Sequence, residues 1–223
     1  VWWLLKQIYN KDLLYKGYTI QPYSPKAGTG LSSHEVNQPG SYRDVTDTTI
    51  VAQFKAKDET LPSFLQGFGT VHFLAWTTTP WTLPSNTALT VGPKIDYVLV
   101  KTINQYTNIE VNVVLAKNLL DKIIPLPNIS NLAKKLQNDD PLYNGDFVEL
   151  AKNMANSSRI VLAEFKGADL VGIRYEQLLP LALPYQNPEN AFRVISGDFV
   201  TTEDGTGIVH TAQTFGPDEA KVA

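Results

Sequence analysis

The sequence contains no cysteine, and this absence rules out two classes of structure. No disulfide framework can form, and no metal site can be built from thiolates. Histidine is almost as scarce, since only His34, His72 and His210 are present and they lie far apart in the sequence. Spacing this wide disfavours a zinc site without excluding one.

Long apolar runs and targeting signals are also missing. No stretch approaches the roughly 20 apolar residues that a membrane-spanning helix needs. The opening residues, VWWLLKQIYNKDLLYKG, lack a basic region followed by an apolar run and a small-residue cleavage site. They therefore do not have the pattern of a signal peptide.

An excess of positive charge is missing as well. The chain carries 19 Lys and Arg against 22 Asp and Glu, which gives a formal net charge of −3 at pH 7. A basic footprint over the whole surface, typical of nucleic-acid-binding domains, is therefore absent, and any contact with nucleic acid must be local. With 223 residues, the chain is long enough for one globular domain with its own core.

Both ends of the sequence predict helices that are cut short. Apolar residues from Trp2 to Leu13 recur at helical spacing, which indicates an amphipathic helix already under way at the first residue. Pro217 behind Gly216 predicts a second helix that begins just before the last residue, Ala223. We therefore expect the chain to be an excised part of a larger protein.

Short alternating or β-branched segments predict strands over much of the chain. They lie at residues 18–23, 48–56, 71–76, 89–91, 96–102, 159–165, 192–200 and 205–212. Residues 111–124 predict a strand that passes into a helix, and residues 167–180 predict a strand and a turn. Gly- and Pro-rich turns separate the strands, which favours a closed or partly closed barrel. We predict a strand-dominated α+β fold, a β-barrel-like single domain over residues 1–223 with peripheral helices. Residues from about 101 to 160 are polar and Asn-rich for much of their length, and we expect them to form a peripheral excursion.

The first segment able to support chemistry is TTTPWTLPSN, residues 77–86. Three consecutive threonines at the end of a strand present hydroxyls to both faces, because strand side chains alternate. Pro80 and Pro84 stiffen the peptide and predict an extended or turning segment with no helix. The hydroxyls and the Asn86 amide could position a water or hold a ribose or carbonyl oxygen. The alternative is a β-branched strand that leads into a Pro-rich loop without a chemical role.

The second segment is GTGIVHTAQTFGPDE, residues 205–219. It predicts a strand that ends near His210, then a turn, then a helix whose first turn holds Asp218 and Glu219. One of these carboxylates could receive the ammonium group of a ligand. Alternatively, both only complement the helix dipole and His210 only packs in the core. A Walker-type phosphate loop and a Gly-x-Ser-x-Gly nucleophile elbow are both absent.

Three motifs in this order, TTTPWTLPSN, GTGIVHTA and FGPDE, resemble the editing domain inserted in the catalytic fold of isoleucyl-tRNA synthetases, which are class I aminoacyl-tRNA synthetases. The resemblance continues through WWLLKQIY, YSPKAGTGLSSHEV and YRDVTDTTIVAQF, and it is weakest from about 101 to 160. The valyl and leucyl relatives typically have an arginine after the paired threonines and an acidic residue after the proline. Thr79 and Trp81 stand at those positions here, which favours the isoleucyl branch.

The resemblance implies roles for the residues that match its first motif. Thr77, Thr78 and Thr79 correspond to the threonine-rich peptide that contacts the substrate and helps to place the attacking water, so they are the expected catalytic residues. Trp76 and Trp81 would shape the wall of the same pocket and bind substrate.

The remaining expected substrate-binding residues come from the end of the first motif and from the other two motifs. Asn86 matches the asparagine of the family, and His210 matches the histidine that helps to exclude isoleucine. The aspartate that binds the amino group in the family falls at Glu219, directly after Asp218, so either carboxylate could make that contact. A further departure is Gln213, where proline is common in the family.

The activity implied by this resemblance is hydrolysis of the ester in valyl-tRNA(Ile), and also of valyl-adenylate. The chain would then be an aminoacyl-tRNA deacylase domain of an ATP-dependent isoleucine–tRNA ligase in the cytoplasm. Its expected partners are the 3′ acceptor end of tRNA(Ile), the mischarged valine and the rest of the synthetase chain, with no membrane. No cofactor or metal is expected for this domain, whereas the parent enzyme would use ATP and magnesium.

Three other interpretations remain open. The domain could edit the tRNA for valine or leucine, although Thr79 and Trp81 count against this. It could be a catalytically impaired module that docks the acceptor end of the tRNA, a hypothesis that the glutamate at position 219 keeps open. A generic β-barrel binding domain would fit the composition but would leave three ordered motifs unexplained.

Overall fold

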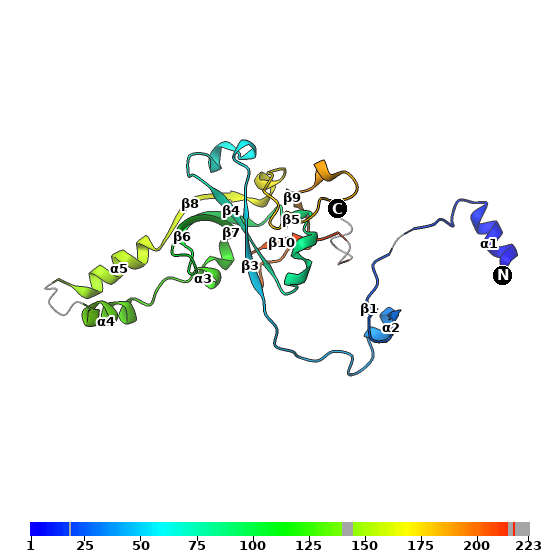
Figure 1. The fold of residues 1–223 in the computed structure, drawn as a ribbon, viewed down its shortest axis with the longest axis horizontal. Coiled ribbons are helices and arrows are strands. Elements are labelled where there is room, and N and C mark those ends of the chain that lie inside the picture. The colour runs from blue at the N-terminus through cyan, green and yellow to red at the C-terminus, as the bar shows by residue number, and fades with distance from the viewer. Residues whose placement is uncertain (18, 140–144, 214–215, 217–223) are drawn as a thin grey trace.

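The computed structural model describes residues 1–17, 19–139, 145–213 and 216 (Figure 1). Within these residues, eight strands form one mixed sheet in the order β8-β6-β7-β4-β10-β5-β9, with β3 added beside β4. The strands are β3 (Ile50–Lys55), β4 (Val71–Thr77), β5 (Ala88–Val91), β6 (Asp96–Ile103), β7 (Glu110–Ala116), β8 (Arg159–Lys166), β9 (Arg193–Ser196) and β10 (Ile208–Thr211). The predicted strand-dominated α+β class is confirmed.

A segment that is not itself a regular strand closes part of this sheet into a barrel. Residues 172–176, here called the closing segment, follow β8 and lie between β9 and β3. The strand predicted within residues 167–180 is wrong as a regular strand, because this segment makes only two isolated bridges, Ala56–Tyr175 and Arg174–Arg193. On one side, the Gly172 N–H donates to the Val194 carbonyl at 2.9 Å, and on the other, the Glu176 N–H donates to the Lys55 carbonyl at 2.8 Å. Strands β3, β4, β10, β5 and β9 and the closing segment therefore form a ring, so the predicted barrel-like fold is confirmed.

The inside of this ring is the main hydrophobic core. Its fully buried side chains come from every strand of the ring and include Phe54, Phe73, Leu89, Val194 and Ile208. Strands β7, β6 and β8 continue the sheet outward from β4, and we call these three strands the sheet extension. A second, smaller cluster covers one face of the extension and includes Leu120 at the start of helix α3 (Leu120–Ile123).

The predicted peripheral excursion at about 101–160 is narrower in the structure. Helices α4 (Ile129–Asp139) and α5 (Phe147–Ser157) form a hairpin that projects away from the sheet (Figure 1). Strand β7, by contrast, lies inside the sheet between β6 and β4, and Val113 and Val114 are buried there. The strand passing into a helix that the sequence predicts at residues 111–124 is confirmed by β7 and α3, but β7 is not peripheral as expected. The division of residues 1–223 into domains stays a prediction.

Residues 1–49 lie outside the barrel (Figure 1). Helix α1 (Trp2–Tyr9) has no buried residue and ends before Leu13, and Asp12 has a left-handed backbone with φ of 54°. Between α1 and β3, the described residues form only the short β1 (Tyr23–Ser24), β2 (Thr29–Gly30) and α2 (Ser33–Val36). The strand predicted at 18–23 is therefore wrong for residues 19–22. The helix predicted from Pro217 lies outside the described residues.

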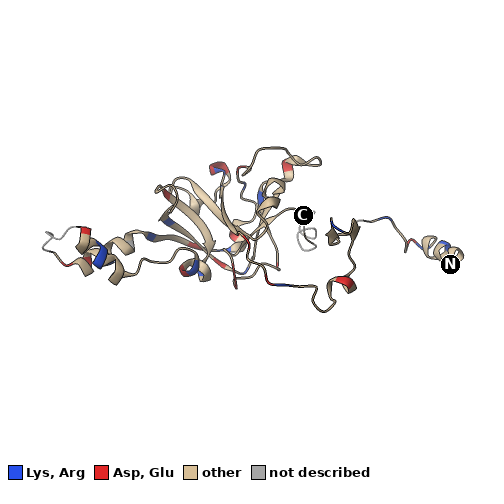
Figure 2. Ribbon diagram, turned by 60° about the horizontal axis from the view of Figure 1, so that its bottom comes forward, with Lys and Arg blue, Asp and Glu red and all other residues tan. Residues whose placement is uncertain are grey.

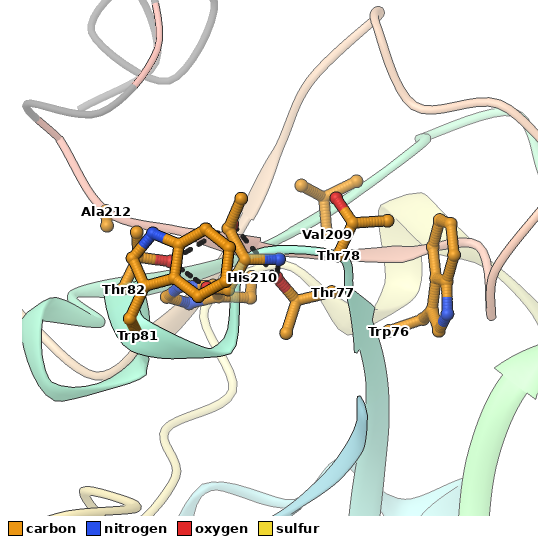
Figure 3. Close-up of a pocket in the computed structure, with 9 residues that line it drawn as sticks. Trp76, Thr77, Thr78, Trp81, Thr82, Val209, His210 and Ala212 are labelled. Atoms are coloured by element: carbon orange, nitrogen blue, oxygen red, sulfur yellow. Dashed lines mark hydrogen bonds between the residues drawn. The ribbon is translucent and has the colours of Figure 1, made fainter. Parts of the chain in front are cut away.

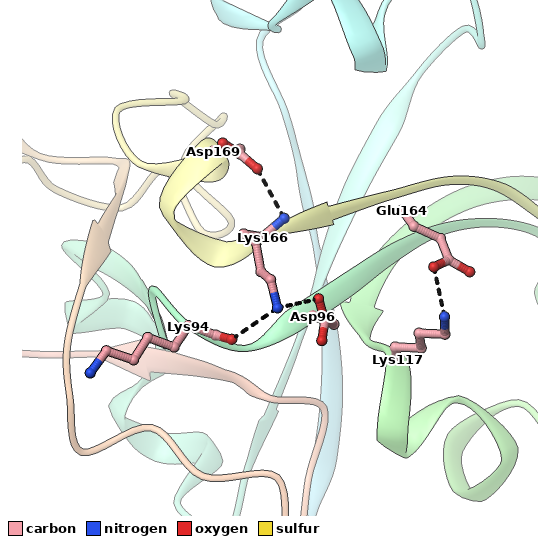
Figure 4. Close-up of polar contacts among 6 residues, drawn as sticks. All are labelled: Lys94, Asp96, Lys117, Glu164, Lys166 and Asp169. Atoms are coloured by element: carbon pink, nitrogen blue, oxygen red, sulfur yellow. Dashed lines mark hydrogen bonds and ion pairs between the residues drawn. The ribbon is translucent and has the colours of Figure 1, made fainter.

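None of the helices in the described ranges is both long and apolar enough to cross a membrane. Lysine and arginine residues and aspartate and glutamate residues are scattered along the ribbon (Figure 2). On the sheet extension they form exposed ion pairs, with Lys166 Nζ 2.6 Å from Asp96 Oδ1 and Lys117 Nζ 2.6 Å from Glu164 Oε2 (Figure 4). In each of these two pairs, a carboxylate compensates the charge of the lysine.

Candidate functional site

A pocket of about 450 Å³ opens where strands β4 and β10 end (Figure 3). The two strands run parallel, with Val209 opposite Trp76, so their carboxyl ends reach the same edge of the sheet. This pairing brings together the two segments that the sequence singled out. The pocket is lined by Trp76, Thr77, Thr78, Thr79, Trp81, Thr82, Val209, His210 and Ala212.

The three consecutive threonines differ in how free their hydroxyls are. Thr77 is buried, and its Oγ1 accepts a hydrogen bond from the Thr79 N–H at 3.0 Å. The hydroxyl oxygens of Thr77 and Thr79 lie 3.3 Å apart. Thr78 is exposed to the pocket, and its hydroxyl makes no hydrogen bond within the part of the chain that the structure describes. Thr78 therefore has the hydroxyl most available to a ligand.

The peptide after the threonines is a 3-10 helix, η3 (Pro80–Ser85), so the prediction of a non-helical segment is wrong. Pro80 stands at the first position of η3, where its missing N–H leaves no hydrogen bond unmade and its φ angle is already suited to a helix. The Thr82 N–H and the Thr82 hydroxyl both donate to the Thr79 carbonyl, at 3.0 and 2.8 Å. This turn directs Thr82 and Trp81 toward the pocket.

The two tryptophans lie at opposite ends of the pocket (Figure 3). Trp81 is 64% exposed, whereas Trp76 is half-buried. Gly205 has a φ of 74°, and a Cβ atom at this position would come within 2.8 Å of the Trp76 ring. The backbone N–H of Trp76 also donates to the Thr206 hydroxyl at 3.2 Å. The loop before β10 thus fixes the half-buried end of the pocket and leaves the Trp81 end open.

His210, on β10, forms a buried side of the pocket and is only 6% exposed. Its Nε2 lies 3.0 Å from Thr82 Oγ1, and its Nδ1 lies 2.8 Å from Asn86 Nδ2. Burial lowers the pKa of His210 from 6.5 to about 4, so the ring is neutral at pH 7. A neutral ring whose two nitrogens are both engaged is suited to shaping a pocket rather than to taking a proton from water.

Asn86 lies behind His210 and not in the pocket wall. Its amide is buried, with Nδ2 donating to the Ala88 carbonyl at 2.9 Å and Oδ1 accepting from the Tyr175 hydroxyl at 2.7 Å. The structure therefore brings Asn86 to His210. The contact between Asn86 and a substrate that the family resemblance implies stays a prediction.

The two candidate carboxylates, Asp218 and Glu219, lie outside the described residues, so their role also stays a prediction. Gln213, just beyond the pocket, is described and exposed. No three His, Asp or Glu side chains lie close enough together to hold a metal ion within the described ranges. The lining itself offers hydroxyls, two indole rings and one imidazole.

Four residues at or behind the pocket were not singled out from the sequence. Thr82, Val209 and Ala212 line it, and each stands within or beside a motif, so the motifs themselves were the signal. Tyr175 had no such signal. It reaches Asn86 across 89 residues of sequence because the closing segment brings it into the barrel.

Comparison with known proteins places this arrangement in context. A family model described as tRNA synthetases class I (I, L, M and V) matches residues 1–203. The chain is 60% identical over its full length to an isoleucine–tRNA ligase of Bacteroides fragilis and 58% identical to that of Cytophaga hutchinsonii. It spans only 18% of the length of each of these relatives. These matches confirm the resemblance that the motifs indicated.

Among solved structures, the chain is similar to the editing domain of the cytosolic leucyl-tRNA synthetase of P. knowlesi. The likeness has a TM-score of 0.44 and 14% identity, and it covers 74% of this chain and 56% of that one.

Proposed function

The chain belongs to the class I tRNA synthetases of the isoleucine, leucine, methionine and valine group, and on that premise we propose that its pocket edits tRNA(Ile). The proposed reaction is hydrolysis of the ester that links a wrongly attached valine to the 3′-terminal adenosine. Valyl-adenylate is a second proposed substrate of the same pocket. Since the chain matches isoleucine–tRNA ligases over less than a fifth of their length, the proposal also makes it one part of such an enzyme.

The observation that carries this proposal is that one small pocket holds both the available Thr78 hydroxyl and a fixed, buried histidine. A hydrophobic site separates two side chains that differ by one methylene by only 10- to 200-fold. The family's own discrimination of isoleucine from valine, about 150-fold, is the standard example of that limit. A second pocket that admits only the smaller side chain would supply the missing selectivity. In the proposed arrangement, the packed ring of His210 is the wall that limits the size of the side chain.

The chemistry asked of the pocket is modest, because an aminoacyl ester is already activated toward water. To hydrolyse such an ester, the protein needs only to position the water and to stabilise the oxyanion that develops. The Thr78 hydroxyl, which has no hydrogen-bond partner among the described residues, can donate to a carbonyl oxygen or hold the water, whereas the Thr77 and Thr79 hydroxyls engage each other at 3.3 Å. His210 is not assigned as a general base, since both ring nitrogens are already engaged.

The rest of the proposed complex follows from the same reaction. The 3′ acceptor end of tRNA(Ile) enters from the open side of the pocket near Trp81, and Asp218 or Glu219 receives the ammonium group of valine. No cofactor is proposed for this pocket, and the use of ATP and magnesium by the parent enzyme stays a prediction. The cytoplasmic location also stays a prediction.

The test is deacylation of valyl-tRNA(Ile) by the complete synthetase and by its Thr78→Ala variant. Loss of one donor to a developing oxyanion is expected to lower kcat by about 100-fold. Thr107→Ala is the matched control, because Thr107 is exposed in the turn between β6 and β7, at the far end of the sheet from the pocket. Failure of the unmodified enzyme to release valine would favour the alternative, a module that only docks the acceptor end.

A further inference from the structure

A continuous line of hydrogen bonds joins the closing segment of the barrel to the rim of the pocket. The Tyr175 hydroxyl bonds to Asn86, which bonds to His210 at 2.8 Å. The His210 ring then bonds to the Thr82 hydroxyl at 3.0 Å, and this hydroxyl donates to the Thr79 carbonyl at 2.8 Å. We call these five groups the His210 chain.

The orientation of the Asn86 amide decides which group donates in each hydrogen bond of the His210 chain. The group that faces the Ala88 carbonyl at 2.9 Å must be the Nδ2 donor, because an oxygen there would leave two acceptors facing each other. The opposite atom, Oδ1, accepts from Tyr175. Nδ2 therefore donates to His210 Nδ1, so the proton of the neutral ring is on Nε2 and is donated to Thr82.

Tyr175 is held so that its hydroxyl has little freedom. The residue is fully buried, and its ring packs edge-on against Phe54, with centroids 5.4 Å apart, and against Phe192 at 6.2 Å. Its backbone N–H donates to the Phe192 carbonyl at 3.0 Å, within the closing contacts of the barrel. The position of the hydroxyl is therefore set by the barrel itself and not by the pocket.

We propose that Tyr175 is a positioning residue for amino-acid selection: through Asn86, it holds His210 in one tautomer and one ring orientation. This inference rests on the proposed editing function. A histidine ring that could rotate or change tautomer would let the pocket widen, whereas a ring that is hydrogen-bonded at both nitrogens keeps the pocket at one size. Tyr175 lies behind Asn86, outside the pocket lining, and acts on the substrate only through His210.

Tyr175→Phe isolates this role, because it keeps the packed ring and deletes only the hydroxyl. The Asn86 Oδ1 atom is then left in a dry interior without a donor, which favours a shift of the amide and of the histidine that it holds. In the complete synthetase, kcat/KM for deacylation of isoleucyl-tRNA(Ile) is expected to rise about tenfold relative to valyl-tRNA(Ile). The change is expected in KM for the isoleucyl ester, with kcat for the valyl ester retained.

Tyr97→Phe is the matched control. Tyr97 is also fully buried, and its hydroxyl donates to the Gly207 carbonyl at 2.5 Å and accepts from the Gly92 N–H at 3.0 Å, outside the His210 chain. Both variants lose one buried hydroxyl, so thermal unfolding is compared in both. A loss of stability alone cannot create hydrolysis of the isoleucyl ester in one variant and not in the other.

A second variant, Asn86→Asp, keeps the size of the side chain but, as a carboxylate, has no hydrogen to donate to His210 Nδ1. It is expected to change the selectivity in the same direction as Tyr175→Phe and by more. Unchanged selectivity in Tyr175→Phe and Asn86→Asp, or an equal gain in Tyr97→Phe, would overturn the positioning role alone. Absence of valyl deacylation in the unmodified enzyme would overturn the proposed function and the inference with it.

Discussion

The barrel and the sheet extension use polar side chains in opposite ways. In the barrel, Tyr175, Asn86 and His210 are at most 6% exposed, and each bonds to a residue far away in the sequence. The extension carries ion pairs such as Lys166–Asp96, whose side chains are more than half exposed. Buried polar groups are costly unless all their bonds are made, whereas exposed ion pairs contribute little. The barrel therefore specifies one arrangement of its pocket, and the extension tolerates change.

The strongest way to break this comparison is to remove the buried ring. His210→Ala is expected to let the pocket accept isoleucine, and hydrolysis of isoleucyl-tRNA(Ile) should rise by up to about 100-fold, the scale of discrimination by one methylene. Deacylation kinetics of the complete synthetase measure this. His34→Ala, at an exposed histidine in α2, is the control. Continued protection of the isoleucyl ester in His210→Ala would argue against a steric role.

A second test uses pH. Because burial lowers the pKa of His210 from 6.5 to about 4, the unfolded chain binds this proton more tightly than the folded chain. The contribution of the neutral ring to stability is present above pH 6.5 and is lost as the pH falls toward 4, by about 3 kcal/mol. The free energy of unfolding of the chain, measured between pH 7 and pH 4, should fall less steeply in His210→Ala. Equal slopes in the two proteins would contradict the buried neutral histidine.

The smallest effect is expected on the sheet extension. Lys166→Met removes the exposed ion pair with Asp96 and should lower the free energy of unfolding by less than about 1 kcal/mol. The difference should shrink further in high salt, because ions screen exposed charges. A loss as large as the one expected at His210, or any change in selectivity between the two esters, would remove the distinction between the two regions.

Much of the sheet, in the barrel and in the extension, could be predicted from the sequence, because its strands carry β-branched and alternating residues. Strands β3, β4, β5, β6 and β8 begin and end within two residues of their predicted bounds. Closure could not be predicted in the same way. The closing segment pairs through single bridges and lone hydrogen bonds, and these leave no period in the sequence.

The pocket, too, could be predicted from the sequence only in part. The threonines and His210 were found because two motifs flank them, and the parallel pairing of β4 with β10 explains why the motifs meet. The helical turn at Pro80 was missed because proline was treated only as a helix breaker, although it fits a first turn. The role of Asn86 behind His210 depends on Tyr175, which lies 89 residues away, and no local pattern reports such a contact.

The most direct measurement is the release of amino acid from valyl-tRNA(Ile) and from isoleucyl-tRNA(Ile) by the complete synthetase under identical conditions. Rapid hydrolysis of the valyl ester and survival of the isoleucyl ester are expected, because the fixed His210 ring limits the pocket to the smaller side chain. Survival of both esters, or hydrolysis of both at the same rate, would contradict this expectation.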